Sequence, residues 1–377
     1  MIDAHNKKSI YVATIIDSHN YGTTLQAVAT RDALEEYGRP IFVDYCRSQW
    51  TRGGWVRSYL GDANHSFAVN LMRLMFNIPS RLRSEYVFRG FLKRELELCD
   101  SAPYLEGGDF SSDSIYCVGS DQTWNIECNY GLDPVYFLKN VPDSCRKVAF
   151  SASFGRGVLD ASESETTSLL LHTFRAISVR ETSSLKILNS MGIHDGVALK
   201  DPVLLCNPSI WTHLSDNASP LSDVNYVLVY MLNENIEMAS YGAEVAARRG
   251  VPAYMVTFNP LKRAPRGLKA ICLPSVEGWL ALFRHAGLVV TDSFHGTCFS
   301  ILFEKPMVIF DPPRFSVRLT DLLVDFNLSC RRVEGFDDAM LRGIDSATID
   351  WDEVRLRLEH ERAVAREFLR YATGDHE

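Results

Sequence analysis

Short runs of apolar and β-branched residues alternate along the chain with stretches that have the spacing of amphipathic helices. The run 9–16 (SIYVATII) predicts a strand, 23–38 (TTLQAVATRDALEEYG) predicts a helix, and 40–45 (PIFVDY) predicts a second strand. A strand, a helix and a strand in this order form a βαβ unit, which implies a parallel sheet. Further strands are expected in the first half of the chain at 114–120, 147–154, 176–180 and 196–201.

The alternation is interrupted at 206–225, which is rich in Ser, Pro, Asn and Asp and is predicted to be a linker. A second series follows, with strands expected at 226–232, 251–257, 269–273, 287–291 and 305–310 and helices at 236–249, 276–286 and 296–303. We therefore predict an α/β protein in which two doubly wound Rossmann-like domains, 1–205 and 226–349, face a cleft. The remaining stretch, 350–377, predicts a charged helix that is a candidate to pack back on the N-terminal domain.

Composition agrees with two folded domains. The chain has 377 residues, of which 46% are hydrophobic and 23% charged. Nine scattered cysteines without a CxxC pair favour reduced thiols over disulfides or a metal cluster. No signal-peptide pattern opens the chain, and no apolar run approaches the roughly 18 residues of a membrane span, so a cytoplasmic location is expected. The formal charge of −8 weighs against nucleic acid as a partner.

The charge is unevenly distributed along the chain. The segment 47–94 contains nine arginine or lysine residues against two acidic residues, Asp62 and Glu85, and aromatic residues are interleaved with the cations. This mixture suits an anionic membrane surface or an anionic ligand that carries a ring. Ordinary helices with solvated arginines are the other interpretation. The membrane interpretation would give the protein a peripheral contact at the inner face of the membrane.

Polar and small residues gather in the segments that follow the predicted strands. Ligands of doubly wound sheets bind beyond the carboxyl ends of the strands, where the N–H groups of helix N-termini can also receive an anion. The sequence therefore predicts a binding site at these segments: 17–24 (DSHNYGTT), 119–125 (GSDQTWN), 151–157 (SASFGRG), 180–184 (RETSS), 201–205 (DPVLL) and 291–297 (TDSFHGT).

Together these segments resemble the polysaccharide pyruvyl transferase family. The resemblance rests on HNYGTTLQAVA, VGSDQTWN, SASFG, SVRE, DPVLL, VTDSFHGTCFSILFEKPMVIF and SVRLTDLL, which occur in the family's order between about residues 9 and 325. It implies a fold similar to that of the B-type glycosyltransferases. It also implies a reaction in which phosphoenolpyruvate, a co-substrate rather than a cofactor, gives its pyruvate to two hydroxyls of one sugar. The product is a ketal on a cell-surface polysaccharide, such as a capsule or exopolysaccharide, or on its precursor, and phosphate is released.

Phosphoenolpyruvate has two anionic ends, so its site needs fixed cations and N–H groups. Arg180 follows an apolar strand, and the resemblance makes it a donor ligand; an ion pair with Glu181 or another acid is the structural interpretation. Many relatives have an arginine where this chain has Ser293, so that cation must come from elsewhere, with candidates Arg318, Arg314 and Lys200. The predicted donor-binding residues are Arg180, Ser293, Phe294, Gly296, Thr297 and Arg318.

His295 is predicted to be the catalytic residue. The reaction needs a proton at C3 of the donor and the loss of a proton from the attacking hydroxyl, and one imidazole can exchange both. His295 is expected directly before the helix 296–303, whose N–H groups would hold the anion, and Gly296 would allow close approach of the ligand. Asp292 would orient His295 or cap the helix.

The acceptor, a sugar or glycan that is free, nucleotide-activated or lipid-linked, is expected at the N-terminal domain. Trp124 would offer it an aromatic face, with core packing as the other interpretation, and Asp121 would bind a hydroxyl or cap the turn that follows it. The predicted acceptor-binding residues are His19, Asn20, Asp121, Gln122, Trp124, Asn125 and Ser153.

Two rival functions remain open at this stage. A nucleotide-sugar glycosyltransferase of the same fold would release a nucleoside diphosphate instead of phosphate. A carbohydrate-binding relative without activity would bind a glycan and not turn it over, and the departure at Ser293 keeps this reading open. Nothing in the sequence predicts a metal site.

Overall fold

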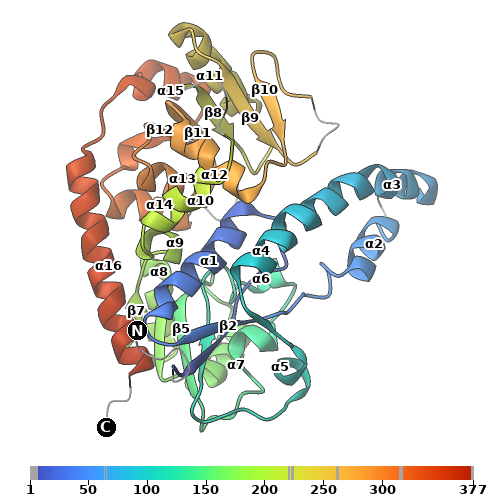
Figure 1. Cartoon of the computed structure of the whole chain (residues 1–377), viewed down its shortest axis with the longest axis vertical. Coiled ribbons are helices and arrows are strands. Elements are labelled where there is room, and N and C mark those ends of the chain that lie inside the picture. Colours follow the sequence, from blue (N-terminus) through green and yellow to red (C-terminus); the bar gives the residue numbers. More distant parts are fainter. Residues whose placement is uncertain are drawn as a thin grey trace.

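The computed structural model describes residues 7–62, 64, 66–219, 221, 225–259, 263–313 and 317–374. Its strands form two sheets, one of seven strands in the order β3-β2-β1-β4-β5-β6-β7 and one of six in the order β10-β9-β8-β11-β12-β13. Every pair of neighbouring strands is parallel. The sheets belong to the two halves of the chain, with helices packed on their faces (Figure 1). The predicted fold, two doubly wound domains, is therefore the one that the chain adopts.

The N-terminal domain alternates strands and helices as predicted. Its strands are β1 Ser9–Ala13, β2 Arg39–Val43, β3 Leu98–Cys99, β4 Ile115–Val118, β5 Arg146–Ala152, β6 Ala176–Val179 and β7 Val197–Ala198. Its helices include α1 Tyr21–Glu35, α5 Ala102–Glu106, α6 Ile126–Asn129, α7 Ala161–Leu171, α8 Thr182–Ser190 and α9 Pro202–Leu205. Several strands are shorter than the apolar runs that predicted them. In the run 9–16 the residues after β1 are still buried, so burial continues beyond the paired backbone.

The C-terminal domain repeats the pattern. Its strands are β8 Val227–Tyr230, β9 Ala253–Thr257, β10 Lys269–Cys272, β11 Leu288–Thr291, β12 Met307–Phe310 and β13 Arg332–Val333. Its helices are α10 Ser209–Asp216, α11 Ile236–Arg249, α12 Val276–His285, α13 Phe294–Leu302, α14 Val317–Asp325 and α15 Phe336–Arg342. Helix α10 lies inside 206–225, so this predicted linker is not irregular throughout. Trp211 on α10 is buried against Phe299 of α13, which explains why the polar composition did not prevent folding.

One hydrophobic core joins the two domains. It combines side chains from the inner faces of both sheets, whereas a second and a third core lie on the outer faces. Tyr21, at the start of α1, stacks on Trp279 of α12 with ring centroids 5.3 Å apart. Its hydroxyl donates to the carbonyl of Pro274 at 2.7 Å. These contacts hold the first turn of α1 against the C-terminal domain and so place it at the cleft.

The last helix, α16 (Trp351–Thr373), lies beside both domains along one edge of the molecule (Figure 1). Near its beginning, Arg355 forms an ion pair with Glu304 of the C-terminal domain. Farther along, Arg362 donates to the carbonyl of Leu204 at 3.0 Å, and Tyr37 donates to the carbonyl of Arg366 at 3.2 Å. The C-terminal half of α16 therefore contacts the N-terminal domain.

The basic segment forms a helical hairpin. It consists of α2 (Arg52–Leu60), α3 (Phe67–Ser84), a π-helical turn (Glu85–Arg89) and α4 (Gly90–Glu95). Helices α2 and α3 project away from both sheets (Figure 1). No helix in the described part of the chain combines the length and the apolar character that are needed to cross a membrane.

Candidate active site

The loop between β11 and α13 is fixed by its own hydrogen bonds. The hydroxyl of Ser293 accepts from the N–H of Gly296 at 3.2 Å, and the hydroxyl of Thr291 accepts from the N–H of Ser293 at 3.0 Å. Ser293 is thus the N-cap, and α13 begins at Phe294, two residues earlier than predicted. The correction places His295 in the first turn of the helix, which fixes the direction of its side chain.

Asp292 neither orients His295 nor caps the helix, contrary to the prediction. Its carboxylate accepts from the backbone N–H groups of Leu232 at 2.7 Å and Asn233 at 3.0 Å. The side-chain amide of Asn233 donates to it as well, at 2.9 Å. The residue is 4% exposed. Asp292 therefore joins the end of β11 to the segment after β8, and its oxygens are occupied by this role.

His295 lies where the two domains touch. Its Nε2 is 3.5 Å from Oδ2 of Asp201, at the outer limit of a hydrogen bond, and the described residues offer it no closer partner. The other side of the ring lies against Gly22, where an added Cβ would be only 2.1 Å from Nδ1. Glycine at the start of α1 is therefore needed for the close approach of α1 to α13.

Arg180 belongs to a cluster of ion pairs with Asp201 and Asp121, and Asp201 is also the residue that faces His295. Nη1 of Arg180 is 2.6 Å from Oδ2 of Asp201, and its Nη2 is 3.5 Å from Oδ1 of Asp121. Arg180 is 4% exposed and does not line the cavity described below. Two carboxylates hold its guanidinium, as the alternative interpretation of an ion pair with another acid expected, and the contact of Arg180 with the donor stays a prediction. Glu181, the partner considered first, instead accepts from Ser153 at 2.8 Å.

The carboxylates of Asp201 and Asp121 in this cluster stay ionised although they are buried. Burial would raise the pKa of the Asp201 carboxyl, but the contact with His295 and the charge of Arg180 hold it well below its ordinary value. The pKa of Asp121 is also lowered, since the nearby charges of Arg180, His295 and Arg318 outweigh the effect of burial. Both carboxylates are therefore ionised at neutral pH, and Asp201 presents a fixed negative charge to His295.

Arg318 is the cation that lines the cavity among the residues that the structure describes. Its Cζ lies 5.4 Å from the ring centroid of Phe294, and Cζ of Arg180 lies 4.9 Å from the same ring. The guanidinium of Arg318 makes no hydrogen bond or ion pair with any residue in the described ranges, and its Nε is buried without a partner. Burial and repulsion from Arg180 lower the pKa of Arg318 to about 10, so it keeps its charge at neutral pH. A charged guanidinium in this state is suited to an anion.

Lys200, another proposed source of this cation, does not line the cavity. Nζ of Lys200 is 2.6 Å from Asp325 and 3.6 Å from Glu361, so Lys200 ties the domains to α16. Arg314 lies outside the described residues. Among the three candidates, Arg318 is the one that the structure places in the site.

The cavity lies between the domains and has a volume of about 280 Å³. This volume is at the lower end of the usual range for ligand pockets and fits a small ligand. The N-terminal domain contributes Asn20, Thr23, Asp121 and Gln122 to its lining. The C-terminal domain contributes Leu232, Asn233, Asp292, Ser293, Phe294, His295, Pro312, Arg318 and Leu319.

The N-terminal side of the cavity is organised around the first turn of α1. The side chain of Asn20 accepts from the N–H groups of Gly22 at 2.8 Å and Thr23 at 3.3 Å. The hydroxyl of Thr23 donates to Asp121 at 2.8 Å. Asp121 also accepts from the N–H of Gln122, as the alternative interpretation of a turn cap expected. Asn20 and Asp121 thus line the cavity while they stabilise their own loops.

His19 lies at a separate hollow of about 170 Å³, beneath the base of the hairpin. Its ring stacks on Phe88 with centroids 5.8 Å apart, and its Nδ1 is 3.4 Å from Nη1 of Arg81. Burial, together with the charge of Arg81, lowers the pKa of His19 to about 4. At neutral pH this imidazole is uncharged, so it can share hydrogen bonds with a hydroxyl.

The structure corrects three predictions of acceptor contacts. Trp124 is 1% exposed, and its indole N–H donates to the carbonyl of Tyr136 at 2.8 Å, so its ring is part of the core. Asn125 caps α6. Ser153 is fully buried and donates to Glu181. None of these three side chains lines the cavity or the His19 hollow.

Two predicted donor contacts are corrected as well. A Cβ at Gly296 would lie 2.7 Å from the hydroxyl of Thr291, so this glycine allows α13 to pack on β11, and it does not line the cavity. Thr297 is fully buried, and its hydroxyl donates to the carbonyl of Ser293 at 3.0 Å. The residues of this loop that line the cavity are Asp292, Ser293, Phe294 and His295.

Gly22, Thr23, Asp201 and Asn233 belong to the site but were not among the predicted site residues, and neither were the apolar lining residues Leu232, Pro312 and Leu319. Gly22 and Thr23 belong to the segment NYGTT, and Asp201 begins the segment DPVLL, so a signal was present in segments already singled out. Asn233 follows β8 without any local pattern that marks it.

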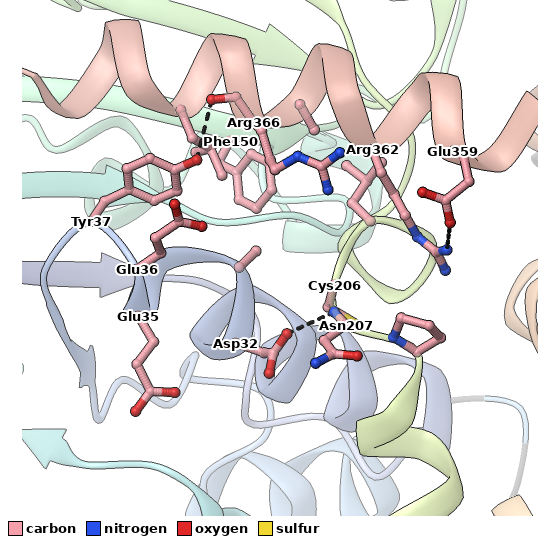
Figure 2. A pocket seen from close by; sticks show the side chains of 15 residues that line it. Asp32, Glu35, Glu36, Tyr37, Phe150, Cys206, Asn207, Glu359, Arg362 and Arg366 are labelled. Carbon is pink, nitrogen blue, oxygen red and sulfur yellow. Dashed lines mark hydrogen bonds and ion pairs between the residues drawn. The ribbon is translucent and has the colours of Figure 1, made fainter.

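A larger hollow, of about 590 Å³, lies away from this site (Figure 2). It is formed by the end of α1, the loop after α9, and α16. Polar groups in it join these elements: Asp32 accepts from the N–H of Asn207, and Arg362 pairs with Glu359. Since several of its polar groups already serve the packing of α16, size alone does not make it the active site. Among the described residues no group of three or more His, Cys, Asp or Glu is placed to hold a metal ion.

The chain is a two-domain protein with a glycosyltransferase-B-like fold and a cavity between its Rossmann-like domains. Over 95% of its length the chain resembles an S. aureus MnaA–UDP structure, with a TM-score of 0.52, 13% identity and 91% coverage of that chain. It also resembles the UDP-N-acetylglucosamine 2-epimerase of Rickettsia bellii, with a TM-score of 0.51, 8% identity, and coverage of 97% of this chain and 96% of that one. At such identities these likenesses show the fold alone. No curated protein matches the sequence.

The family model for polysaccharide pyruvyl transferase matches residues 20–313. The match spans most of the chain, and the protein belongs to this family, as the sequence segments predicted.

Proposed function

We propose that this protein transfers pyruvate from phosphoenolpyruvate to two hydroxyls of one sugar in a cell-surface polysaccharide or its precursor. A ketal forms and phosphate is released. Membership of the family supports a transferase that acts on polysaccharide. The observation that carries the proposal is that the guanidinium of Arg318, which has no partner among the described residues, lines the same small cavity as His295.

Arg318 serves as the donor's main cation in this proposal. It takes over from the arginine that many relatives have where this chain has Ser293. Its planar, charged fork suits either the phosphate or the carboxylate of the donor. Arg180 then acts through Asp201, because its guanidinium holds the carboxylate that faces His295. Arg180 is thus a positioning residue in this arrangement.

In this proposal one imidazole, that of His295, both donates the proton that the donor needs and accepts the proton that the first hydroxyl loses. Protonated His295 gives a proton to C3 of phosphoenolpyruvate, so that C2 becomes electron-poor and the first sugar hydroxyl attacks it, returning its proton to His295. The C2–O bond to phosphate then breaks, and the second hydroxyl attacks C2 and closes the ketal. Its proton leaves with the phosphate. The carboxylate of Asp201, 3.5 Å from Nε2, stabilises the protonated ring.

The acceptor lies across the cavity from Arg318 in this proposal. Asn20 and Gln122 offer neutral polar groups, which suit hydroxyls, and the uncharged His19 adds a further polar group in the neighbouring hollow. These groups fit a sugar or glycan and do not distinguish a free acceptor from a lipid-linked one.

Titration calorimetry with phosphoenolpyruvate tests the donor site without an acceptor. Arg318→Gln should weaken binding about 10- to 100-fold, since a charge-assisted contact is lost. Arg248→Gln is the matched control, because Arg248 lies on α11 and pairs with Asp345 outside the cavity. Equal affinity of Arg318→Gln and the unaltered protein would overturn the assignment.

Product analysis separates this function from its rivals. Phosphate release from phosphoenolpyruvate in the presence of sugars, nucleotide sugars or polyprenyl-linked sugars is the expected result. Release of a nucleoside diphosphate from a nucleotide sugar would instead support the glycosyltransferase. Glycan binding without either product would support a non-catalytic relative.

A further inference from the structure

The helical hairpin is firmly anchored at one end. α3, the π-helical turn and α4 follow one another without a break from residue 67 to residue 95. Phe88, Phe91 and Leu92, toward the end of this rod, are each 1% exposed in the shared core. The opposite end, α3, projects with α2 beyond both sheets (Figure 1). The tip is therefore held rigidly away from the body of the protein.

The outer face of α3 is entirely apolar from residue 67 to residue 82. The side chains of Phe67, Met75 and Phe76 are among the most exposed, at 66%, 63% and 62%. At about 100° per residue, the exposed positions fill one continuous arc of more than half of the helix circumference. The exposed residues of this arc are Phe67, Ala68, Val69, Leu71, Met72, Met75, Phe76, Ile78, Pro79 and Leu82.

The remaining arc of α3 is used for packing. Asn70, Leu74 and Ser84 are buried, and the amide of Asn70 donates to the carbonyl of Asp62 at 2.7 Å. The apolar arc is thus not a face that α2 covers. Monomeric proteins rarely expose an apolar patch of this extent, and such patches mark sites that bind a protein or a membrane.

Charge decides between these two kinds of occupant. The segment 47–94, which contains the apolar arc, has a net charge of +7, although Arg47, Arg89 and Arg94 pair with Asp17, Asp44 and Glu277 outside the segment. Arg57 of α2 and Arg83 of α3 are exposed on the projecting part of this segment. A two-fold dimer through α3 would bring two such segments together, because the same patch faces itself across a two-fold axis. Anionic lipid headgroups would neutralise the same charge.

We propose that the α2–α3 hairpin docks on the surface of an anionic membrane. The apolar arc of α3 lies at the boundary of headgroups and acyl chains, and Arg57 and Arg83 contact the headgroups. Docking rests on the hairpin alone and does not depend on the chemistry proposed for the cleft.

Docking would also bring the His19 hollow close to the lipid. Arg81 of α3 lines this hollow, and its guanidinium donates to the carbonyl of Trp50 at 2.7 Å. Glu85 and Arg89 of the π-helical turn line it as well. The base of the membrane-bound rod is thus one wall of a hollow next to the cleft, a position from which a lipid-linked acceptor could be reached.

Vesicle flotation of the full chain tests the proposal. At low salt the protein should float with vesicles of phosphatidylcholine and phosphatidylglycerol and stay behind with phosphatidylcholine alone. High salt should weaken the binding, since it screens the headgroup charges. The double variant Met75→Ser/Phe76→Ser should bind at least about tenfold more weakly, because two side chains lose their burial in lipid. Arg57→Ser should weaken vesicle binding about fivefold, as expected for the loss of one surface cation.

Leu169→Ser and Leu356→Ser are matched controls for the loss of exposed apolar side chains. These residues are 72% and 73% exposed on α7 and α16, away from the hairpin, and their substitution should leave flotation unchanged. Thermal unfolding of each variant establishes that it is folded. Failure of the unaltered protein to bind anionic vesicles at low salt would overturn the proposal. A dimer in sedimentation equilibrium that Met75→Ser/Phe76→Ser dissociates, with vesicle binding unchanged, would instead assign the arc to a second copy of the chain.

Discussion

The two walls of the cavity are built in different ways, although the sequence predicted similar loops for both. After β11, Ser293 is extended, with φ of −96°, and caps a helix, so Phe294 and His295 remain at the cavity. After β4, Asp121 has φ of 73°, in the left-handed region, and the chain turns inward. Trp124, three residues later, is in the core.

The difference shows how much of a binding site can be predicted from a polar segment that follows a strand. Its position predicts the edge of the sheet where a ligand binds. Which of its side chains face the ligand depends on the backbone direction within the loop. On the C-terminal side one loop supplies four successive residues, Asp292 to His295, whereas on the N-terminal side two segments supply two residues each. Substitutions in the two walls should therefore have different effects.

The largest effect is expected at the C-terminal wall. His295→Gln should lower the rate of phosphate release at saturating phosphoenolpyruvate by about 10²- to 10⁴-fold, the usual contribution of general acid–base catalysis. Donor affinity, measured by titration calorimetry, should change much less, because Arg318 still holds the anion.

His285→Gln is the control for this experiment. His285 is the last residue of α12, precedes β11 and does not line the cavity, so its substitution should be almost neutral. Nearly full activity of His295→Gln, or an equal loss of activity in His285→Gln, would show that His295 is not the catalytic residue.

A second substitution acts where the walls meet. A Cβ at Gly22 would lie 2.1 Å from Nδ1 of His295, so Gly22→Ala must displace the ring or separate the domains. Turnover should fall about 10- to 100-fold, since small displacements of a reacting group are costly. Gly90→Ala, where an added Cβ meets no atom within 4 Å, should keep its turnover. Unchanged kinetics in Gly22→Ala would show that the contact does not matter for the reaction.

The smallest effect is expected at His19 of the N-terminal domain, where it changes the free energy of unfolding. Burial and Arg81 lower the pKa of His19 from 6.5 to about 4, so the folded state binds a proton less readily than the unfolded state. Its contribution is complete above about pH 6.5 and is lost as the pH falls toward 4, with stability changing by up to about 1.4 kcal/mol per pH unit.

Urea unfolding at pH 7 and pH 5 measures this contribution. The unaltered protein should lose about 1–2 kcal/mol more free energy of unfolding between these pH values than His19→Asn does. All other titrating groups are common to both proteins and cancel in the comparison. An identical pH dependence of the two proteins would mean that His19 is not held in its uncharged form.

Much of this protein was predictable from its sequence. Apolar runs and helical spacing are local properties, so they gave the order of strands and helices, with α11 expected and found at 236–249. Alternation of the two element types implied parallel sheets, and the strand-end segments indicated both the family and the cleft that His295 lines.

Only the tertiary structure decided which of these residues meet. The carboxylate of Asp201 that holds Arg180 is 21 positions away along the chain, and that of Asp121 is 59 positions away. Arg318 enters the cavity from another helix, and Gly22 meets His295 across the domain boundary. Sequence spacing does not report such contacts, because they arise when separate elements pack together and compete for the same buried charges and space.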